Sequence, residues 1–218
     1  MKLPLDIHTH HSSLMASSQW DAIRSFSYPF NGCRDAAWHS LGIHPMDEGA
    51  FSEKALERLS SLSCDPSCLM IGEVGLDKRS LVPFQVQMTY LEIQARLAES
   101  LKKPLVIHMV QSMNELIKLK RQLHPVQPWL IHGFRGKPQM AEQLLREGFS
   151  LSFGEYFNED SLRKIPSDHL FLETDESHLP FEIILRNAAE VRGVSLESFT
   201  EELERNVRRL FPSIESVT

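Results

Sequence analysis

The chain has 218 residues, a size typical of one barrel or open α/β sheet, and it is long enough to bury a sizeable core. Hydrophobic residues make up 42% and charged residues 24%, which excludes an intrinsically disordered chain. The formal net charge of −6 excludes a polybasic surface that wraps long nucleic acid, because such binding needs many Lys and Arg contacts to phosphate. It leaves open an enzyme that contacts only a few phosphates.

Short apolar runs alternate with amphipathic stretches along the whole chain. The runs contain β-branched and aromatic residues and are flanked by breakers, as buried strands are. They are residues 3–8, 22–26, 38–43, 68–74, 105–108, 129–132, 149–153 and 170–172. From residue 68 onward, strands and helices alternate, which predicts a parallel sheet with right-handed crossovers.

The predicted helices have recognisable ends. Apolar residues recur at helical spacing over 84–101, and Pro104 follows. The segments 138–147 and 180–192 each begin near a proline and end before a glycine. Two further helices are expected, one with a stripe from Leu116 to Leu123 and one capped by Ser195 with a stripe from Leu196 to Leu210.

The first 45 residues fit this pattern less well. Only 11 residues, 27–37, separate the second and third runs, which is near the minimum for a parallel crossover. No amphipathic helix is expected there or between His11 and Asp21. We therefore predict a TIM-type (β/α) barrel with its first one or two helices shortened or missing. Seven strands, or a sheet that does not close, are the alternatives.

One domain spanning residues 1–218 is expected, because no repeat, low-complexity tract or linker divides the chain. Cys33, Cys64 and Cys68 are an odd number and too few for a disulfide framework. The sequence shows no apolar signal core and no run as long as a membrane span. These observations predict a cytoplasmic protein with no membrane partner.

Histidines and carboxylates gather at the carboxyl ends of the predicted strands. His8 and His10 are two residues apart in a strand, so they point to the same face. The other such residues are Glu73, Asp77, His108, His132 and Asp175. In a barrel these strand ends converge on the face where the active site is built. Imidazole and carboxylate donors without thiolates fit one or two divalent metal ions.

The order of these motifs resembles the TatD-like family of metal-dependent hydrolases, the TatD-type deoxyribonucleases, among the amidohydrolase-like barrels. The resemblance runs from Asp6 to Phe211. It rests on Asp6-Ile7-His8-Thr9-His10, Gly42-Ile43-His44-Pro45, Gly72-Glu73-Val74-Gly75-Leu76-Asp77, Val106-Ile107-His108, residues 131–136, Leu172-Glu173-Thr174-Asp175, and Asn206 with Arg209-Leu210-Phe211.

This resemblance implies a ligand set and a reaction. One metal would be held by His8, His10 and Asp175, the other by His108 and His132, with Glu73 bridging. The two divalent ions, Zn²⁺, Mn²⁺ or Mg²⁺, would activate a water for phosphodiester hydrolysis. Asp175 is expected to act as the general base and Glu73 to serve the same centre. The expected substrates are single-stranded DNA, DNA ends or a small phosphodiester, with no obligate protein partner.

Two departures from the family pattern stand out. The region before His44 is short, as in a compact branch of the family. The residue soon after the fifth-strand histidine is usually Arg or Lys, whereas this chain offers only Gln111, which predicts a weaker phosphate contact. Arg135 and Lys78, just beyond strand ends, are the other candidate phosphate contacts. His44 is either a substrate contact or a structural residue of its turn.

Two other functions compete with the nuclease hypothesis. Barrels of this superfamily share ligands across reactions, so hydrolysis of an amide or ester bond is one. A metal-bound protein that has lost turnover is the other, and Gln111 is its only support.

Overall fold

The computed structural model describes residues 2–11, 19–212 and 214. Its strands are parallel and follow one another in chain order around a closed barrel, which confirms the predicted fold and excludes seven strands or an open sheet. The strands are β1 (Pro4–Thr9), β2 (Asp21–Ser27), β3 (Trp38–Gly42), β4 (Cys68–Asp77), β5 (Leu105–Val110), β6 (Trp129–Ile131), β7 (Phe149–Phe153) and β8 (Leu170–Leu172).

The helices confirm the predicted pattern with two additions. They are α1 (Glu53–Leu62), α2 (Phe84–Leu101), α3 (Met113–Leu123), α4 (Pro138–Arg146), α5 (Glu159–Lys164), α6 (Phe181–Arg192) and α7 (Leu196–Leu210). The sequence did not predict α1 or α5. In the described part of the chain, no helix is long and apolar enough to cross a membrane.

The shortened crossover near the amino terminus is present. Between β2 and β3 the chain forms a single turn of 3₁₀ helix, η2 (Cys33–Asp35), as expected for a barrel that lacks a helix there. The expectation of no helix between His11 and Asp21 falls mostly on residues 12–18, which lie outside the described residues.

The chain divides into two compact units. We call residues 1–24 with 132–218 the terminal unit, and residues 25–131 the central unit. The expectation of a single domain stays a prediction.

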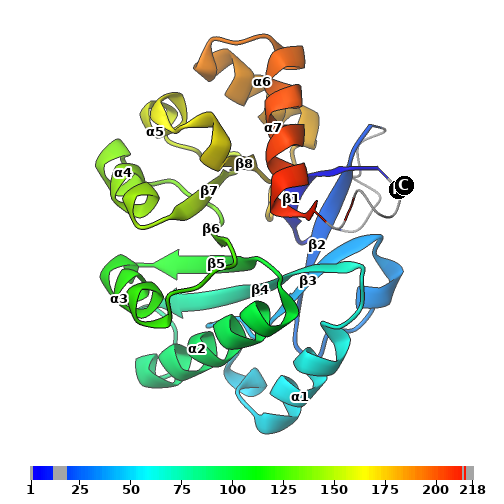
Figure 1. Cartoon of the computed structure of the whole chain (residues 1–218), viewed down its shortest axis with the longest axis vertical. Helices are drawn as coiled ribbons and strands as arrows, with labels where there is room; N and C mark the ends of the chain where they lie inside the picture. The colour runs from blue at the N-terminus through cyan, green and yellow to red at the C-terminus, as the bar shows by residue number, and fades with distance from the viewer. Residues whose placement is uncertain (1, 12–18, 213, 215–218) are drawn as a thin grey trace. The chain divides into compact units, whose positions relative to one another are not determined.

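In the terminal unit, α7 packs against β1 and β8 (Figure 1). Its buried stripe includes Phe199, Leu203 and Val207, which confirms the amphipathic pattern in the sequence. The buried Asn206 amide donates to the carbonyls of Ser167 at 2.6 Å and Leu170 at 2.9 Å. This side chain therefore fixes α7 to the start of β8.

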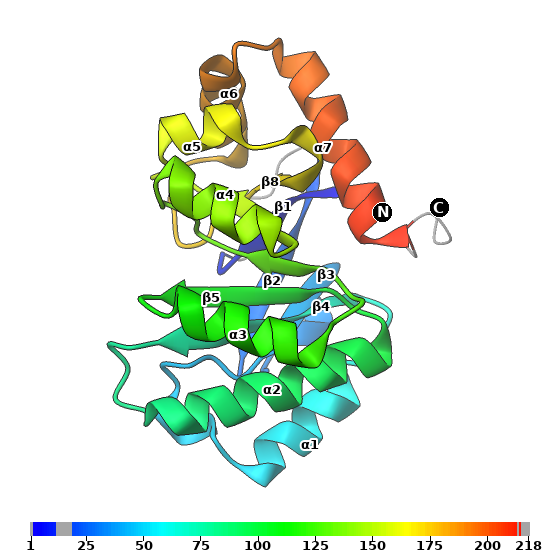
Figure 2. The ribbon, with the colours of Figure 1, turned by 60° about the vertical axis from the view of Figure 1, so that its left-hand side comes forward.

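In the central unit, α2 packs on β4 and α3 on β5 (Figure 2). Strands β3 to β6 run in parallel register, for example with Val74 opposite Ile107 and Ile107 opposite Ile131. One apolar cluster fills the space near β2, β3 and α1. Its buried members are Phe26, Phe30, Cys33, Leu41, Ile43, Ala50, Ala55, Leu59 and Cys68.

Two glycines of β4 allow β5 to approach closely. Gly72 and Gly75 have φ angles of 143° and 151°, which disfavour side chains. A Cβ at Gly75 would overlap the carbonyl oxygen of His108, and one at Gly72 would overlap the Val106 side chain. The motif around Glu73 therefore needs glycine on both sides for Glu73 and His108 to meet.

His39 on β3 is buried away from the predicted site, and we expect it to make the protein sensitive to acid. Among the described residues, neither of its ring nitrogens has a hydrogen-bond partner. Burial lowers the His39 pKa from 6.5 to about 4, with nearby Asp65 acting to raise it and Lys103 to lower it. The folded state therefore binds fewer protons than the unfolded state between these values.

The neutral His39 ring therefore contributes to the free energy of unfolding above pH 6.5, and this contribution is lost as the pH falls towards 4. The shift corresponds to about 3 kcal/mol. We expect His39→Leu to lose less free energy of unfolding than the wild type between pH 7.5 and pH 4, measured by urea unfolding. His124→Asn is the matched control. Equal acid sensitivity of His39→Leu and the wild type would contradict this prediction.

Candidate metal-binding clusters

The terminal unit brings together His8, His10 and Asp175, the three residues that the family resemblance assigns to one metal. Asp175 Oδ1 lies 3.9 Å from His8 Nε2 and 3.7 Å from His10 Nε2. Ligand atoms bound at about 2.0–2.2 Å from one ion lie roughly 3–4 Å apart, so this spacing fits a shared cation. His132 joins the cluster, since its ligand atoms and those of His8 and Asp175 lie within 4.8 Å of one another.

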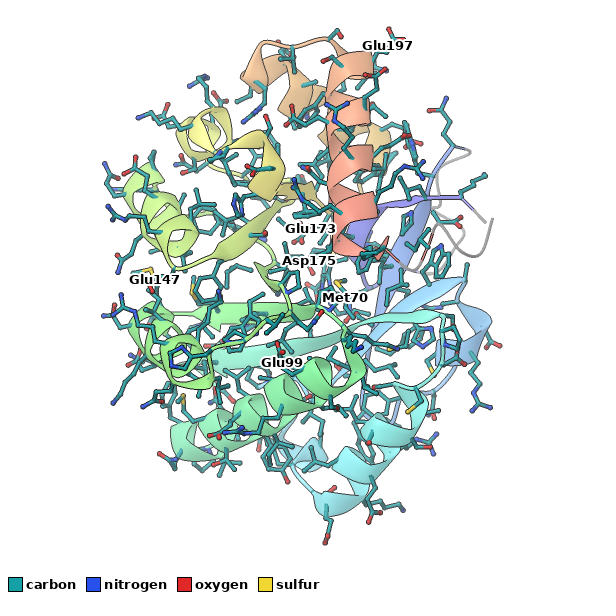
Figure 3. The ribbon with its side chains drawn as sticks, viewed as in Figure 1. Met70, Glu99, Glu147, Glu173, Asp175 and Glu197 are labelled. Atoms are coloured by element: carbon teal, nitrogen blue, oxygen red, sulfur yellow. The ribbon has the colours of Figure 1, made fainter. Side chains whose placement is uncertain are left out.

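The backbone places Asp175 opposite β1. The Asp175 amide donates to the His8 carbonyl at 2.9 Å, and the His10 amide donates to the Asp175 carbonyl at 3.0 Å. Asp175 has a left-handed φ of 53°, so the chain turns there after β8. Figure 3 labels Asp175 beside Glu173, two residues earlier on the same segment. The carboxylate is thus held by strand-like pairing rather than by a free loop.

Asp6 and Thr174 form a second, buried support for this segment. Asp6 Oδ1 accepts the Thr174 amide at 3.0 Å, and Asp6 Oδ2 accepts its hydroxyl at 2.7 Å. Thr174 Oγ1 also lies 2.8 Å from the Thr9 hydroxyl. Burial raises the Asp6 pKa to about 7, although the Thr174 hydrogen bonds act to lower it. Asp6 therefore joins the middle of β1 to the residue before Asp175.

Glu173 is a fully buried carboxylate beside His132. Its Oε1 accepts the Gly133 amide at 2.6 Å and lies 3.5 Å from His132 Nδ1. Burial acts to raise the Glu173 pKa, but the interactions with His132, His8 and Ser152 outweigh it and lower that pKa. An ionised Glu173 facing Nδ1 leaves His132 Nε2 as the nitrogen for a metal.

The central unit contains a second cluster around Glu73. Glu73 Oε1 lies 2.8 Å from His108 Nδ1 and 3.1 Å from His44 Nε2. The ligand atoms of these three residues lie within 4.8 Å of one another. Glu73 is 5% exposed, so its charge is shielded from water and needs cationic or donor partners.

The hydrogen bonds of His44 assign it a role different from that of His108. The Met46 amide donates to His44 Nδ1 at 3.2 Å, so this nitrogen is an acceptor. In the neutral ring the proton is then on Nε2, which donates to Glu73. His44 therefore orients Glu73 in this arrangement and is not itself poised as a ligand.

Asp77 holds the other side of the His108 ring. Its Oδ2 lies 3.1 Å from His108 Nε2, and its carboxylate also accepts two guanidinium bonds and the backbone amide of Arg79. Burial acts to raise the Asp77 pKa, but the bonds from Arg79 and His108 outweigh it and lower that pKa. Asp77 is thus an ionised partner that fixes the ring and leaves Nδ1 facing Glu73.

Two buried glutamines of α2 attach these site-bearing strand ends to the helix. The Gln87 side chain accepts the Asp77 amide at 2.8 Å and donates to the Asp77 carbonyl at 3.1 Å. Gln94 makes the same pair of bonds with Ile43, next to His44, at 2.7 and 3.3 Å. Each side-chain amide supplies the hydrogen bonds that a neighbouring strand would otherwise give to a buried backbone N–H and C=O.

Replacing Gln87 with Met is expected to lower the free energy of unfolding by about 2–6 kcal/mol. Methionine has about the same length as glutamine but cannot make the two hydrogen bonds to the buried N–H and C=O of Asp77. Each lost hydrogen bond costs about 1–3 kcal/mol. Gln85→Met, at an exposed position of the same helix, is the matched control. Urea unfolding of both variants measures the difference. Equal free energies of unfolding for the two variants would contradict this prediction.

The remaining predicted substrate contacts are Lys78, Gln111 and Arg135. The Lys78 ammonium already pairs with Glu115 at 2.6 Å. Gln111 is exposed and has a left-handed φ of 55°. The Arg135 guanidinium stacks over the Tyr156 ring, 5.1 Å from its centroid. Their roles as phosphate contacts stay predictions.

Sequence reasoning did not assign roles to several residues that support the site. Glu173 and Asp77 lay inside the quoted motifs, but their partners are distant in sequence. Gln87 and Gln94 carried a signal that could have been used. They fall within the apolar stripe of α2, where an uncharged polar residue indicates a buried hydrogen-bonding role.

Clusters of histidine and carboxylate at the carboxyl ends of parallel barrel strands define the class of metal-binding α/β barrels. A family model, TatD related DNase, matches residues 13–212. The chain belongs to this family.

Individual relatives agree with that assignment. A 3'-5' ssDNA/RNA exonuclease TatD of Cronobacter turicensis is 28% identical over 73% of this chain, and the match spans 63% of that protein's length. An uncharacterized metal-dependent hydrolase, YabD, of Bacillus subtilis is 26% identical over 81% of this chain and 78% of its own. The crystal structure of YJJV, a TatD homolog of Escherichia coli K12, superposes with a TM-score of 0.84 at 22% identity, covering 96% of this chain and 98% of that one. This last likeness shows the fold.

Proposed function

We propose that the protein is a divalent-metal-dependent phosphodiesterase, a deoxyribonuclease that acts on single-stranded DNA or DNA ends. The observation that carries this proposal is the convergence of His8, His10 and Asp175, with ligand atoms 3.7 and 3.9 Å apart, in a chain of the TatD related DNase family. The name of the Cronobacter relative, a 3'-5' exonuclease, supports attack from the 3' end.

Two divalent ions, Zn²⁺, Mn²⁺ or Mg²⁺, complete the proposed centre. The family resemblance assigns His8, His10 and Asp175 to one ion and His108 and His132 to the other, although the ligand atom of His132 also lies within 4.8 Å of those of His8 and Asp175. The family resemblance makes Glu73 the bridging carboxylate. When bound, such ions lower the pKa of a water and offset the charge of a phosphodiester.

The protein side chains supply proton transfer and positioning. Asp175 accepts the proton of the attacking water at a carboxylate oxygen. Its side chain is 23% exposed, so the carboxylate is open to solvent. Glu73 is oriented by its contacts with His44 and His108. Arg135 binds a phosphate oxygen, with Lys78, His44 and Gln111 as further substrate contacts.

A cytoplasmic location forms part of the proposal. Free Cys33, Cys64 and Cys68 support it, because disulfides form in oxidising compartments.

A substrate panel tests the proposed reaction. Metal-loaded protein is incubated with single-stranded oligonucleotides labelled at either end, closed-circular DNA and bis-p-nitrophenyl phosphate, and with amides and lactones in parallel. We expect stepwise shortening of the linear strands and little cleavage of circles. Faster turnover of the amides or lactones than of any phosphodiester would contradict the proposal in favour of an amide or ester hydrolase.

A further inference from the structure

An exposed aromatic ring lies on the rim of the terminal unit beside one of the candidate phosphate contacts. Tyr156 follows β7 and is 64% exposed, although a tyrosine ring is a large apolar surface. The guanidinium of Arg135 lies over this ring, 5.1 Å from its centroid. A flat ring and a delocalised cation thus lie together at the surface.

The segment that carries Arg135 is anchored at both ends. The Gly133 amide donates to Glu173 at 2.6 Å, and Ser161 Oγ donates to the Gly136 carbonyl at 2.7 Å. Between them, the buried Phe134 ring packs edge-on against Phe153 of β7. Arg135 therefore projects from fixed backbone that begins at His132, a residue of the candidate metal cluster.

The turn that carries Tyr156 is anchored to the other side of the same cluster. Glu155, the preceding residue, accepts a hydrogen bond from Ser177 Oγ at 2.6 Å. Ser177 lies two residues beyond Asp175, and its amide bonds to the Thr174 carbonyl at 2.8 Å. One oxygen of the Glu155 carboxylate is therefore hydrogen-bonded, and the Tyr156 ring and the Arg135 guanidinium are both exposed.

We propose that Tyr156 and Arg135 form a subsite for one nucleotide of a single-stranded substrate, with the base stacked on the tyrosine ring and the adjacent phosphate bound by the guanidinium. The inference rests on the proposed function and adds the part of the substrate that is recognised. Base stacking on an exposed ring requires an unpaired base, because the faces of paired bases are covered by their neighbours in a duplex. Any base has such a face, so the subsite selects strand state rather than sequence.

The test is binding of a fluorescein-labelled single-stranded oligonucleotide with phosphorothioate linkages, which resist cleavage, to the metal-loaded full chain. Anisotropy is measured for the intact strand and for strands with one abasic site at each successive position. Tyr156→Leu removes the aromatic face at an exposed position, Tyr156→Phe keeps it, and thermal unfolding confirms that both variants fold. We expect Tyr156→Leu to weaken binding of the intact strand by about 5- to 100-fold and Tyr156→Phe to leave it within about twofold.

The abasic series assigns the base. One abasic position should weaken wild-type binding as much as Tyr156→Leu does, and should cause no further loss in that variant. Arg135→Gln should reduce the slope of log K against log salt by about 0.7, whereas Arg163→Gln, at an exposed arginine of α5, should not.

Two results would overturn the subsite without affecting the proposed function: intact-strand binding by Tyr156→Leu equal to that of the wild type, or equal sensitivity of both proteins to every abasic position. Wild-type protein that neither binds nor shortens single strands would instead contradict the proposed function, and the subsite with it.

Discussion

Replacing Asp175 with Asn is expected to lower the turnover number on a single-stranded oligonucleotide by about 10²- to 10⁴-fold, the usual cost of losing a general base. Asparagine has nearly the same side-chain shape as aspartate. The substitution leaves the backbone hydrogen bonds of residue 175 with His8 and His10 in place. An amide nitrogen cannot accept a proton from water, and the amide has lost the charge that attracts a cation. We therefore expect the turnover number to fall more than the affinity for DNA.

Glu176→Gln is the matched control, because it removes one carboxylate at the adjacent, exposed position. Turnover should be measured at saturating metal so that weaker metal binding does not lower it. An Asp175→Asn variant within about threefold of the wild type would place the base elsewhere.

Glu73→Gln is expected to have the largest effect on metal binding. Two imidazole nitrogens face one oxygen of this 5%-exposed carboxylate, at 2.8 and 3.1 Å, so the negative charge is central to its cluster. Loss of an outer partner alone costs about 10–100-fold in metal affinity, and a ligand should cost more. We expect more than about a 100-fold loss.

The bridging role makes a sharper prediction, measured by elemental analysis and by titration with Mn²⁺. If Glu73 bridges, occupancy of both metals falls together. Loss of one metal alone would make it a terminal ligand. Glu92→Gln, at a partly exposed position of α2, controls for the change in net charge.

The strands and their carboxyl-terminal polar residues were predictable because burial imposes a regular pattern on the sequence. The run of β5 is apolar up to His108, and the change to a polar residue marks the carboxyl-terminal half of the strand, which continues to Val110. Helix α1 was missed because only Ala55 and Leu59 of its ten residues are buried. Helix α5 has six residues, too few to establish a period.

The supporting shell of the site could not be predicted in the same way. Asp77 acts on His108 across 31 positions, and Glu173 on Gly133 across 40. No local spacing reports such pairs, because they depend on how the strands align. The opposite pKa shifts of Asp6 and Glu173, two buried carboxylates of one unit, likewise depend on which donors face each of them.

Metal content followed by metal-restored nuclease activity tests the central claim most directly. The purified protein is assayed for bound Zn, Mn and Mg, stripped with EDTA, and then supplied with each ion alone before digestion of a 3'-labelled single strand. We predict up to two divalent ions per chain, no hydrolysis after stripping, and recovery with at least one of the three ions. Hydrolysis that is undiminished in the stripped protein, or a protein that binds no divalent ion, would contradict a metal-dependent nuclease.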